Sequence, residues 1–529
     1  MSYKVLISDS LSEQGLERLR RVPELEIDLR PGLSPDELIR TIADYQALII
    51  RSGTKVTKAV IAAANNLRVI GRAGIGVDNI DVEAATKQGI VVMNTPGGNN
   101  VTTAEHALSL LLALARNIPQ ANASLKAGRW EREKFTGSEV CNKILGVIGL
   151  GNIGAIVAER ALGLKMRVLA YDPFVSPETA AKLRIELGSL DDIYTKADFI
   201  TVHTPLTKDT RGLIGPVAFS KMKKGVRIIN CARGGIVDED ALLHAITSGT
   251  VAGAALDVFV TEPPPAGHPL LKLSQVVGTP HLGAATDEAQ INVAVAIAEQ
   301  VALFLTEGEI QNAVNFPALT AKQRLILQPY ITLGERLGSF LAQLSTDAPL
   351  EVQVEYSGEV AEYEVAPATA AVLRGILSPV LESPVNYVNA PLIARERGIR
   401  VVESRSSLPS DFLNSVRVQI TSTSGTNAVE GAVFSNKAVR LVRFNAFHLE
   451  AVPEGYILAI HNLDVPGVVG MMGTLLGKHG INIASLELGR EKIGGKAIAL
   501  IHVDGQVPTE VLTELQALEP IISAQQIRL

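Results

Sequence analysis

The feature that most restricts the fold of this chain is a glycine triplet placed between an apolar strand and a helix. The stretch ILGVIGLGNIGAIVAERALGLKMRVLAYDP contains Gly149, Gly151 and Gly154 in G-x-G-x-x-G spacing. A strand, a glycine turn and a helix in this order begin a doubly wound dinucleotide-binding sheet. Three turn glycines that bind no ligand are the structural alternative, which this context disfavours.

Asp172 extends the pattern, because the strand after the helix ends at this acid, 18 residues beyond Gly154. A carboxylate at about this offset binds the adenosine ribose of a dinucleotide. The amides of Asn152 and Ile153, at the start of the helix, would face the pyrophosphate. The charge of Asp172 would repel a 2′-phosphate, so the pattern predicts NAD rather than NADP as the cofactor.

Strand-like runs alternate with helical stretches on both sides of the triplet. Before it stand five short runs, KVLISD, ELEIDL, ALIIRS, LRVIGRAG and IVVMNTP, followed by a long helical pattern from about residue 99. The triplet itself opens a second series of six strands, which ends with QVVGTPHLG. Strands and helices that alternate at these lengths predict parallel α/β sheets.

The regular alternation of strand and helix patterns ends after about residue 315. Residues 318 to 450 mix strand and helix patterns, and none of their motifs indicates a chemistry. From residue 455 the order is strand, helix, strand, strand, helix, strand, and Pro466 is expected to be the first helical residue. This order is typical of a ferredoxin-like domain.

Length and composition limit the classes of protein that fit. A chain of 529 residues predicts about three or four domains, and a net charge of −6 argues against nucleic acid and anionic membranes as partners. Cys141 and Cys231 are too few for a disulfide framework or a cysteine metal site, so we expect a reducing, cytoplasmic location and no metal. The start MSYKVLISDS predicts no targeting segment, and the longest apolar run, at 107–115, is too short to span a membrane.

Polar side chains stand at the expected carboxyl ends of the strands, where a doubly wound sheet binds its ligands. In chain order they are Thr204, Arg233, Asp257, Glu262 and His281. Oxidising an alcohol with NAD requires a base, a group that tunes the pKa of that base, and a cation for an anionic substrate. His281, Glu262 and Arg233 fit these three roles. Arg233 has a structural alternative, which is an ion pair with a carboxylate of the protein itself.

The motifs GLGNIG, HTPLT, NCARGGIVDEDAL, ALDVFVTEPP and TPHLGAAT resemble the D-isomer-specific 2-hydroxyacid dehydrogenase family. With RAGIGVDNIDVEAAT and VMNTPGGNN, the first 315 or so residues resemble the branch that opens serine synthesis. The resemblance implies NAD-dependent oxidation of 3-phosphoglycerate to 3-phosphohydroxypyruvate, with the same roles for Arg233, Glu262 and His281. The cofactor contacts that it implies, besides the three glycines, are Ile75, Asn152, Ile153, Asp172, Thr204, Cys231, Arg233, Asp257, His281 and Ala284.

The same resemblance implies a domain order that counting strands along the chain does not reveal. A flavodoxin-like substrate-binding domain would comprise residues 1–97 and 286–315, with a Rossmann NAD domain at 98–285 inserted into it. An α+β intervening domain, similar to an allosteric substrate-binding domain, would follow at 318–450. Residues 455–529 resemble a ferredoxin-like ACT regulatory domain, and we expect a homodimer or homotetramer.

A phosphorylated substrate requires more positive charge than Arg233 alone. The segments IIRSGTK and VIGRAGIG offer Arg51 with Ser52, and Arg72, at strand ends of the first domain. A further source of charge is the stretch GRWEREKF, whose Arg129, Arg132 and Lys134 would act from a partner subunit or form an ordinary solvated loop.

The ACT resemblance implies L-serine as an effector, bound where two such modules meet. The expected contacts are Asn462, Asp464 and Asn482, in the segment IHNLDVPGVVGMMGTLLGKHGINIASLELGR. Relatives often carry tyrosine or histidine in place of Asn462, and Asn482 has the structural alternative of capping the HGIN turn.

Two other functions are compatible with the same motifs. A glyoxylate or hydroxypyruvate reductase on this scaffold would need neither Arg51 nor an effector domain. A non-catalytic NAD(H)-sensing protein would bind NADH tightly and would not oxidise 3-phosphoglycerate.

Overall fold

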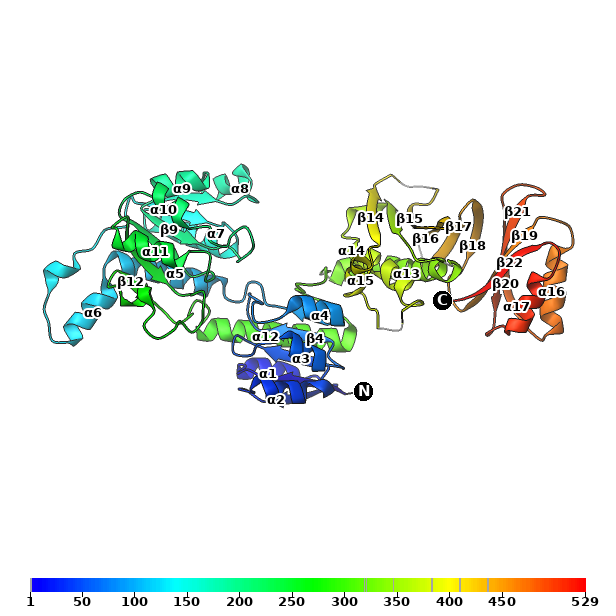
Figure 1. Ribbon diagram of the computed structural model, residues 1–529, viewed down its shortest axis with the longest axis horizontal. Helices are drawn as coiled ribbons and strands as arrows, with labels where there is room; N and C mark the ends of the chain where they lie inside the picture. Colours follow the sequence, from blue (N-terminus) through cyan, green and yellow to red (C-terminus); the bar gives the residue numbers. More distant parts are fainter. Residues whose placement is uncertain are drawn as a thin grey trace.

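The computed structural model describes residues 2–317, 319, 321–345, 347–381, 384–408, 411–434 and 437–529. Residue 318, where the third predicted domain begins, lies outside them. Within the described residues the strands form sheets of five, seven, six and four strands, and each domain is named here by its sheet. The domains give the molecule an elongated shape, with the seven-stranded domain at one end and the four-stranded domain at the other (Figure 1).

The five-stranded domain is a parallel sheet in the order β2-β1-β3-β4-β5, which is the flavodoxin-like order that was expected. Helices cover both faces, which is why strands such as ALII at Ala47–Ile50 are buried along their whole length. Its strands are β1 Tyr3–Ile7, β2 Leu25–Leu29, β3 Ala47–Ile50, β4 Val69–Arg72 and β5 Val91–Met93. Its first helices are α1 Glu13–Arg20, α2 Pro35–Thr41, η1 Ile42–Asp44, α3 Lys58–Ala63 and α4 Val82–Gln88.

Helix α12 (Asp287–Glu307) also belongs to the five-stranded domain, although the chain reaches it only after the seven-stranded domain. Its residues Val293, Ile297 and Val301 share one buried core with strands β1 and β4. The seven-stranded domain is therefore inserted into the five-stranded one, as expected. Among the described residues, α12 is the one helix long and apolar enough to cross a membrane, but 56% of its apolar window is buried, as in a core helix.

The seven-stranded domain is a parallel sheet in the order β12-β11-β10-β9-β6-β7-β8. Six of these strands were predicted, and the seventh, β8 (Glu186–Leu187), is only two residues long and leaves no periodic pattern. The others are β6 Ile144–Ile148, β7 Arg167–Tyr171, β9 Phe199–Val202, β10 Val226–Asn230, β11 Val251–Leu256 and β12 Val276–Gly278. The covering helices are α5 Asn100–Ala115, α7 Asn152–Gly163, α8 Pro177–Lys182, α9 Leu190–Lys196, α10 Pro216–Lys221, α11 Glu239–Thr247 and η3 Pro269–Lys272.

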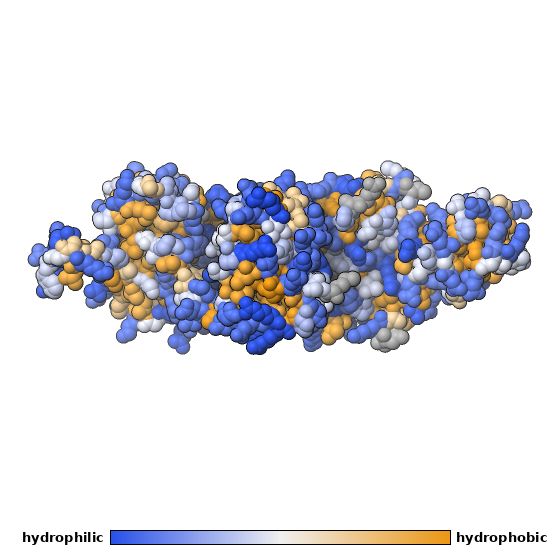
Figure 2. Space-filling view, turned by 90° about the horizontal axis from the view of Figure 1, so that it is seen from below, coloured by the Kyte–Doolittle hydropathy of each residue, from blue (hydrophilic) through white to orange (hydrophobic). Residues whose placement is uncertain are grey.

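The long helical pattern after residue 99 is two helices rather than one. Asn117 adopts a left-handed backbone conformation (φ 52°) that ends the first helix, α5, and Pro119 stands in the first turn of α6 (Ile118–Lys126). Together with η2 (Arg132–Phe135), α6 projects from the seven-stranded domain (Figure 1). This projection carries exposed apolar side chains, among them Leu125 and Trp130, and hydrophobic residues are visible at that end of the molecule (Figure 2).

The six-stranded domain packs helices against one mostly antiparallel sheet in the order β14-β13-β15-β16-β17-β18. It contacts the five-stranded domain at the C-terminal end of α4, where the Asn386 amide donates to the Gly89 carbonyl over 2.8 Å and Lys87 pairs with Glu396 at 2.8 Å. Its helices are α13 Ala321–Leu344, η4 Glu359–Glu362, α14 Ala366–Leu377 and α15 Ala390–Glu396. Its strands are β13 Glu351–Gly358, β14 Arg400–Ser406, β15 Asn414–Ser422, β16 Gly425–Val433, β17 Val439–Phe444 and β18 Phe447–Ala451.

The four-stranded domain has the ferredoxin-like order that was predicted, with strands in the spatial order β20-β21-β19-β22. Its elements are β19 Tyr456–Leu463, α16 Val468–Lys478, β20 Ile483–Arg490, β21 Lys496–Val503, α17 Thr509–Gln516 and β22 Ile521–Arg528. The prediction that Pro466 is the first helical residue is wrong. The N-cap of α16 is Gly467, whose φ of 90° suits glycine, and Pro466 lies in the preceding turn.

Candidate active site

The candidate site is a cavity of about 450 Å³ between the five-stranded and seven-stranded domains. It lies at the carboxyl ends of β4, β9, β10 and β12, the edge at which parallel sheets bind ligands. A second cavity of about 660 Å³ adjoins it, and Arg72, Asp78, Leu206, Arg233 and His281 line both. The first cavity is also lined by Ile75, Asn94, Asn99, Thr103, Asn152, Ile153, Thr204, Cys231, Gly283 and Ala284.

The three glycines of the triplet have different spatial roles. Gly149 has a left-handed backbone (φ 92°), and a Cβ on Gly154 would lie 2.0 Å from the carbonyl oxygen of Gly149. Both positions therefore exclude a side chain for reasons internal to the fold. A Cβ on Gly151, the N-cap of α7, would meet no atom of the described residues within 4 Å, so this residue leaves open space at the helix start.

Asp172 lies beside this open space, at the end of β7. Its Oδ2 accepts a hydrogen bond from the Leu150 amide over 2.8 Å, and its Oδ1 accepts one from the Phe174 amide over 2.8 Å. The two amides hold the carboxylate against the glycine turn, which is the position expected of a ribose-binding acid.

The residues around the turn and the cavity fit a dinucleotide. No side chain of the described residues caps the N-terminus of α7, so its first amides are free for a pyrophosphate. Thr204 Oγ1 and Asn99 Oδ1 are buried, have no hydrogen-bond partner in the part of the chain that the structure describes, and line the cavity. Buried polar atoms of this kind require a partner, which a bound ligand would supply.

Cys231 also lines the cavity, at the end of β10, and is 5% exposed. Burial, followed by the nearby negative charge of Asp257, raises the pKa of its thiol. The side chain is therefore a neutral wall of the cavity and has no thiolate character.

Asp257, a predicted cofactor contact, does not line either large cavity. Its carboxylate is 1% exposed and accepts hydrogen bonds from the amides of Leu282 and Gly283 and from the hydroxyl of Thr279. His106 Nε2 lies 3.1 Å from the same carboxylate. The groups that surround Asp257 thus belong to the protein, and they include the residues directly after His281.

His281 and Glu262 are brought together as predicted, with 2.7 Å between His281 Nδ1 and Glu262 Oε2. The hydrogen bond to Glu262 raises the pKa of His281, against the opposing effect of burial. Burial raises the pKa of Glu262, but the hydrogen bonds from His281 and from the Phe259 amide lower it by more, so the net pKa is below its usual value. The pair is therefore a carboxylate beside an imidazole of increased basicity.

Arg233 already has partners within the protein, whereas a role in substrate binding alone would require an unpaired guanidinium. Its Nε lies 2.8 Å from Asp78 Oδ2 in the five-stranded domain, and its Nη1 donates to the Ala232 carbonyl over 2.7 Å. The structural alternative considered for this guanidinium, an internal ion pair, is thus present. Arg233 still lines both cavities, and its Nη2 lies so close to Gly76 that a Cβ there would be 1.8 Å away.

The predicted phosphate-binding residues occupy different positions in this cleft. Arg72 lines both cavities, and burial followed by repulsion from Arg233 lowers its pKa to about 10. Its Nε is buried and has no hydrogen-bond partner among the residues that the structure describes. Ser52 lines the second cavity, whereas Arg51 lines neither, and its Nη1 donates to the Ser10 carbonyl over 3.4 Å.

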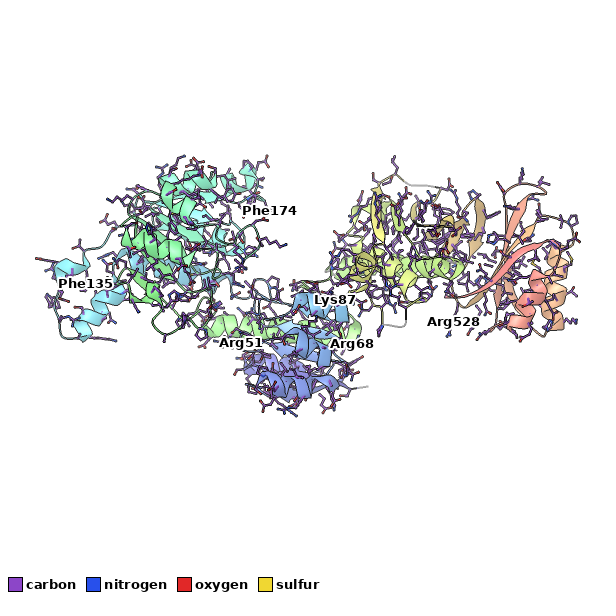
Figure 3. The ribbon with its side chains drawn as sticks, viewed as in Figure 1. Arg51, Arg68, Lys87, Phe135, Phe174 and Arg528 are labelled. Carbon is purple, nitrogen blue, oxygen red and sulfur yellow. The ribbon has the colours of Figure 1, made fainter. Side chains whose placement is uncertain are left out.

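Arg129, Arg132 and Lys134 line neither of the two cavities of their own chain. Figure 3 shows Phe135, at the end of η2, well apart from Arg51 in the five-stranded domain. Glu131 binds Lys134 at 2.6 Å and Arg129 at 3.3 Å, so two of the three cations already have an acidic partner.

The predicted effector contacts do not converge within one chain. Asn462 pairs with Ala497 on β21, whereas Asn482 precedes the Ile483–Val503 pair and donates to Asp504 at the opposite end of that strand. Asn462 is buried, and its Oδ1 has no hydrogen-bond partner within the described ranges. Asp464 accepts from the Gly494 amide over 3.2 Å.

Sequence reasoning missed several residues that line the cavity, chiefly Asp78, Asn94, Asn99 and Thr103. Asp78 stands in RAGIGVDNIDVEAAT and the asparagines in VMNTPGGNN, so the motifs that carry them were visible. Their position at the cavity was not, because it depends on how the first domain faces the second.

Comparison with protein families assigns most of the chain. The NAD binding domain of D-isomer specific 2-hydroxyacid dehydrogenases matches residues 108–283, and NAD is accordingly the cofactor of the seven-stranded domain. The intervening domain of D-3-phosphoglycerate dehydrogenase matches residues 326–445, and the ACT domain matches residues 456–520.

Whole-length relatives agree with this assignment. A D-3-phosphoglycerate dehydrogenase of Archaeoglobus fulgidus is 45% identical, covering 99% of this chain and 100% of that protein. The same enzyme of Synechocystis sp. is 44% identical, covering 99% and 95%. The crystal structure of a NAD-dependent formate dehydrogenase from Staphylococcus aureus in complex with NAD has a TM-score of 0.53 at 29% identity, over 58% of this chain and 97% of that one. This chain belongs to the D-3-phosphoglycerate dehydrogenase family, a branch of the D-isomer-specific 2-hydroxyacid dehydrogenases.

Proposed function

We propose that this protein oxidises 3-phosphoglycerate to 3-phosphohydroxypyruvate with NAD, the first step of the phosphorylated route to L-serine. The observation that carries the proposal is the contact of 2.7 Å between His281 and Glu262 beside a cavity that Arg233 also lines. Relatives at 40 to 45% identity over nearly the whole chain bear the name of this activity. A glyoxylate or hydroxypyruvate reductase and a non-catalytic NAD(H) sensor are not favoured by these relatives.

His281 is the proposed base. Its Nδ1 hydrogen-bonds to the Glu262 carboxylate, so Nδ1 carries the proton and Nε2 is left to accept the hydroxyl proton of the substrate. Glu262 then stabilises the imidazolium that forms. When NAD is bound, its nicotinamide supplies the acceptor for the hydride that leaves C2 of the substrate. In the reverse direction the imidazolium returns the proton, so a single pair of residues serves both directions.

An anionic substrate would fit the cationic side chains that line the cleft, among them Arg72 and Arg233. Arg233 is proposed to bind the carboxylate with the Nη groups that Asp78 leaves available. Arg72 Nε has no partner among the described residues. Together with the wall of the second cavity that contains Ser52, Lys55 and Lys58, this side chain offers a place for the phosphate. Arg51, which lines neither cavity, is proposed to reach the substrate after the domains move.

The test is steady-state NADH production from 3-phosphoglycerate at alkaline pH, with glyoxylate and hydroxypyruvate reduction measured alongside. We expect kcat/KM for 3-phosphoglycerate and 3-phosphohydroxypyruvate to exceed the values for the unphosphorylated acids. His281→Ala should reduce turnover about 100-fold or more while NADH still binds. Tight NADH binding without turnover in the native protein would favour the sensor, and equal rates on unphosphorylated acids would favour the reductase.

We infer further that the protein acts as a homodimer or homotetramer with L-serine as an effector of the ACT domain. Exposed Leu125 and Trp130 on the projecting α6 segment support a contact between copies, which would also bring Arg132 to a partner's cleft. Because Asn462 and Asn482 stand at opposite ends of one sheet, an effector that binds both must lie between two ACT domains. Light scattering, and rates measured with and without serine, test both inferences.

We also propose the domain boundaries and the location. Residues 1–97 and 286–315 would form the substrate domain, 98–285 the NAD domain, 318–450 the intervening domain and 455–529 the ACT domain. Limited proteolysis near residues 315 and 452 tests the last two boundaries. A cytoplasmic location fits the two free cysteines, and fractionation of cells tests it.

A further inference from the structure

We propose that His106 is a positioning residue for His281, acting through the buried carboxylate of Asp257. The proposal rests on the proposed function, because it concerns the residue assigned there as the proton acceptor. The carrying observation is a chain of hydrogen bonds that runs from helix α5, through Asp257, to the backbone on which His281 is held.

The backbone of His281 needs such support. Its φ of 54° lies in the left-handed region, which a residue with a side chain occupies only when its surroundings hold it there. The His281 amide donates to the Asp257 carbonyl over 2.9 Å and to the Thr279 carbonyl over 3.0 Å. The direction in which the imidazole leaves the chain is therefore set by contacts with Asp257.

The carboxylate of Asp257 organises the rest of the same loop. Its Oδ1 accepts from the Leu282 amide over 2.7 Å and from the Thr279 hydroxyl over 2.6 Å, and its Oδ2 accepts from the Gly283 amide over 2.8 Å. These donors precede and follow His281 in sequence. The loop thus wraps around one buried negative charge, and the position of that charge determines the position of the loop.

His106 is the donor that reaches this carboxylate from another element. Its Nε2 lies 3.1 Å from Asp257 Oδ1 and 3.1 Å from Thr279 Oγ1. Because the Thr279 hydroxyl donates to Asp257, the imidazole N–H is the group left to face both oxygens. Burial raises the pKa of Asp257, and the hydrogen bonds from His106 and Thr279 lower it by more, which keeps the carboxylate charged.

Helix α5 holds the loop at two further points. The Thr103 hydroxyl donates to the Gly283 carbonyl over 2.8 Å, and the Thr102 and Thr286 hydroxyls lie 3.2 Å apart. This helix follows β5 of the five-stranded domain and leads into the seven-stranded one. Through His106 it links the loop that presents His281 to the segment that joins the two domains.

Two substitutions of His106 distinguish a role in positioning His281 from a role in packing alone. His106→Gln places an amide nitrogen near the position of Nε2 and keeps a donor for Asp257, whereas His106→Leu keeps apolar bulk and removes the donor. The matched control is Glu105→Leu, because the adjacent Glu105 pairs with Arg160 on α7 and, among the described residues, makes no hydrogen bond or ion pair with the loop.

The measurements are kcat and KM for 3-phosphoglycerate, the Kd of NADH, and hydrogen exchange of residues 279–286. His106→Leu should lower kcat about 10- to 100-fold, since small displacements of a reacting group have effects of this size, with the Kd of NADH changed less than about threefold. Hydrogen exchange of residues 279–286 should be faster in His106→Leu than in the native protein. His106→Gln should restore most of the native kcat and most of the native exchange protection. Glu105→Leu should match the native protein.

A native rate and native exchange in His106→Leu would overturn the proposal, and so would a His106→Gln variant as impaired as the leucine variant. If the native protein does not oxidise 3-phosphoglycerate, the proposed function falls. Hydrogen exchange then still decides the positioning role, because it requires no turnover.

Discussion

Arg233 and Asp78 join the two domains of the cleft through an ion pair, with 2.8 Å between Arg233 Nε and Asp78 Oδ2. Arg233 follows β10 of the seven-stranded domain, and Asp78 follows β4 of the five-stranded domain. The ion pair with Asp78 uses Arg233 Nε, and Nη1 donates to the Ala232 carbonyl. These two contacts fix the orientation of the guanidinium and hence of its remaining N–H groups. Asp78 therefore orients a guanidinium that would otherwise have several rotamers available.

Asp78→Ala should raise the KM for 3-phosphoglycerate, by up to about tenfold, because the substrate carboxylate would have to order the guanidinium itself. Asp78→Asn keeps an acceptor for Nε and should have a smaller effect. Steady-state kinetics at saturating NAD measure both. A lower KM in the alanine variant would mean instead that Asp78 competes with the substrate for Arg233.

Removing the charge of Glu262 should shift the pH dependence of the reaction. The hydrogen bond to Glu262 raises the pKa of His281, and oxidation requires the neutral imidazole, so kcat/KM for oxidation rises as the pH passes upward through that pKa. In Glu262→Gln the pKa of His281 falls, and the acid limb of the profile should move toward lower pH. The maximal rate should fall, because the imidazolium loses its partner.

The control for this shift is Glu514→Gln. Glu514 lies 3.0 Å from His479 in the four-stranded domain and is remote from the cleft, so its loss should leave the profile in place. If the pH profile of kcat/KM in Glu262→Gln coincides with the native profile, its acid limb does not arise from the titration of His281.

Gly151 and Gly154 should respond differently to alanine. A methyl group on Gly154 would lie 2.0 Å from the Gly149 carbonyl oxygen, so Gly154→Ala should lower both the thermal midpoint and NADH affinity. Gly151 has an ordinary φ of −70° and open space around it, so Gly151→Ala should fold normally and weaken NADH binding about tenfold or more. Calorimetry and NADH fluorescence titration distinguish the two, and equal loss of stability would contradict the assignment of the space to the cofactor.

The parts of the site that could be predicted from the sequence are those that one sheet brings together. Arg233, Glu262 and His281 follow successive strands of one parallel sheet, and the carboxyl ends of such strands meet at one edge. Local periodicity and this single rule therefore suffice to predict that the three lie near one another.

Other features depend on contacts that no local pattern encodes. The pairing of Arg233 with Asp78 spans 155 residues and depends on how two domains face each other. The burial of Asp257 by its own loop likewise appears only when donors from α5 and from residues 279–283 are assembled. The two-residue strand β8 was missed for a different reason, since two residues are too few to show a period.

Asp172 should determine the choice between NAD and NADP. Its carboxylate is held beside the glycine turn by the amides of Leu150 and Phe174, where a 2′-phosphate would meet a fixed negative charge. Asp172→Ser removes that charge and should lower the NAD-to-NADP ratio of kcat/KM at least about tenfold, mostly through a lower KM for NADP. Asp240→Ser, in the exposed first turn of α11, is the control for a change in net charge. An unchanged ratio in Asp172→Ser would show that exclusion of NADP arises elsewhere in the adenosine site.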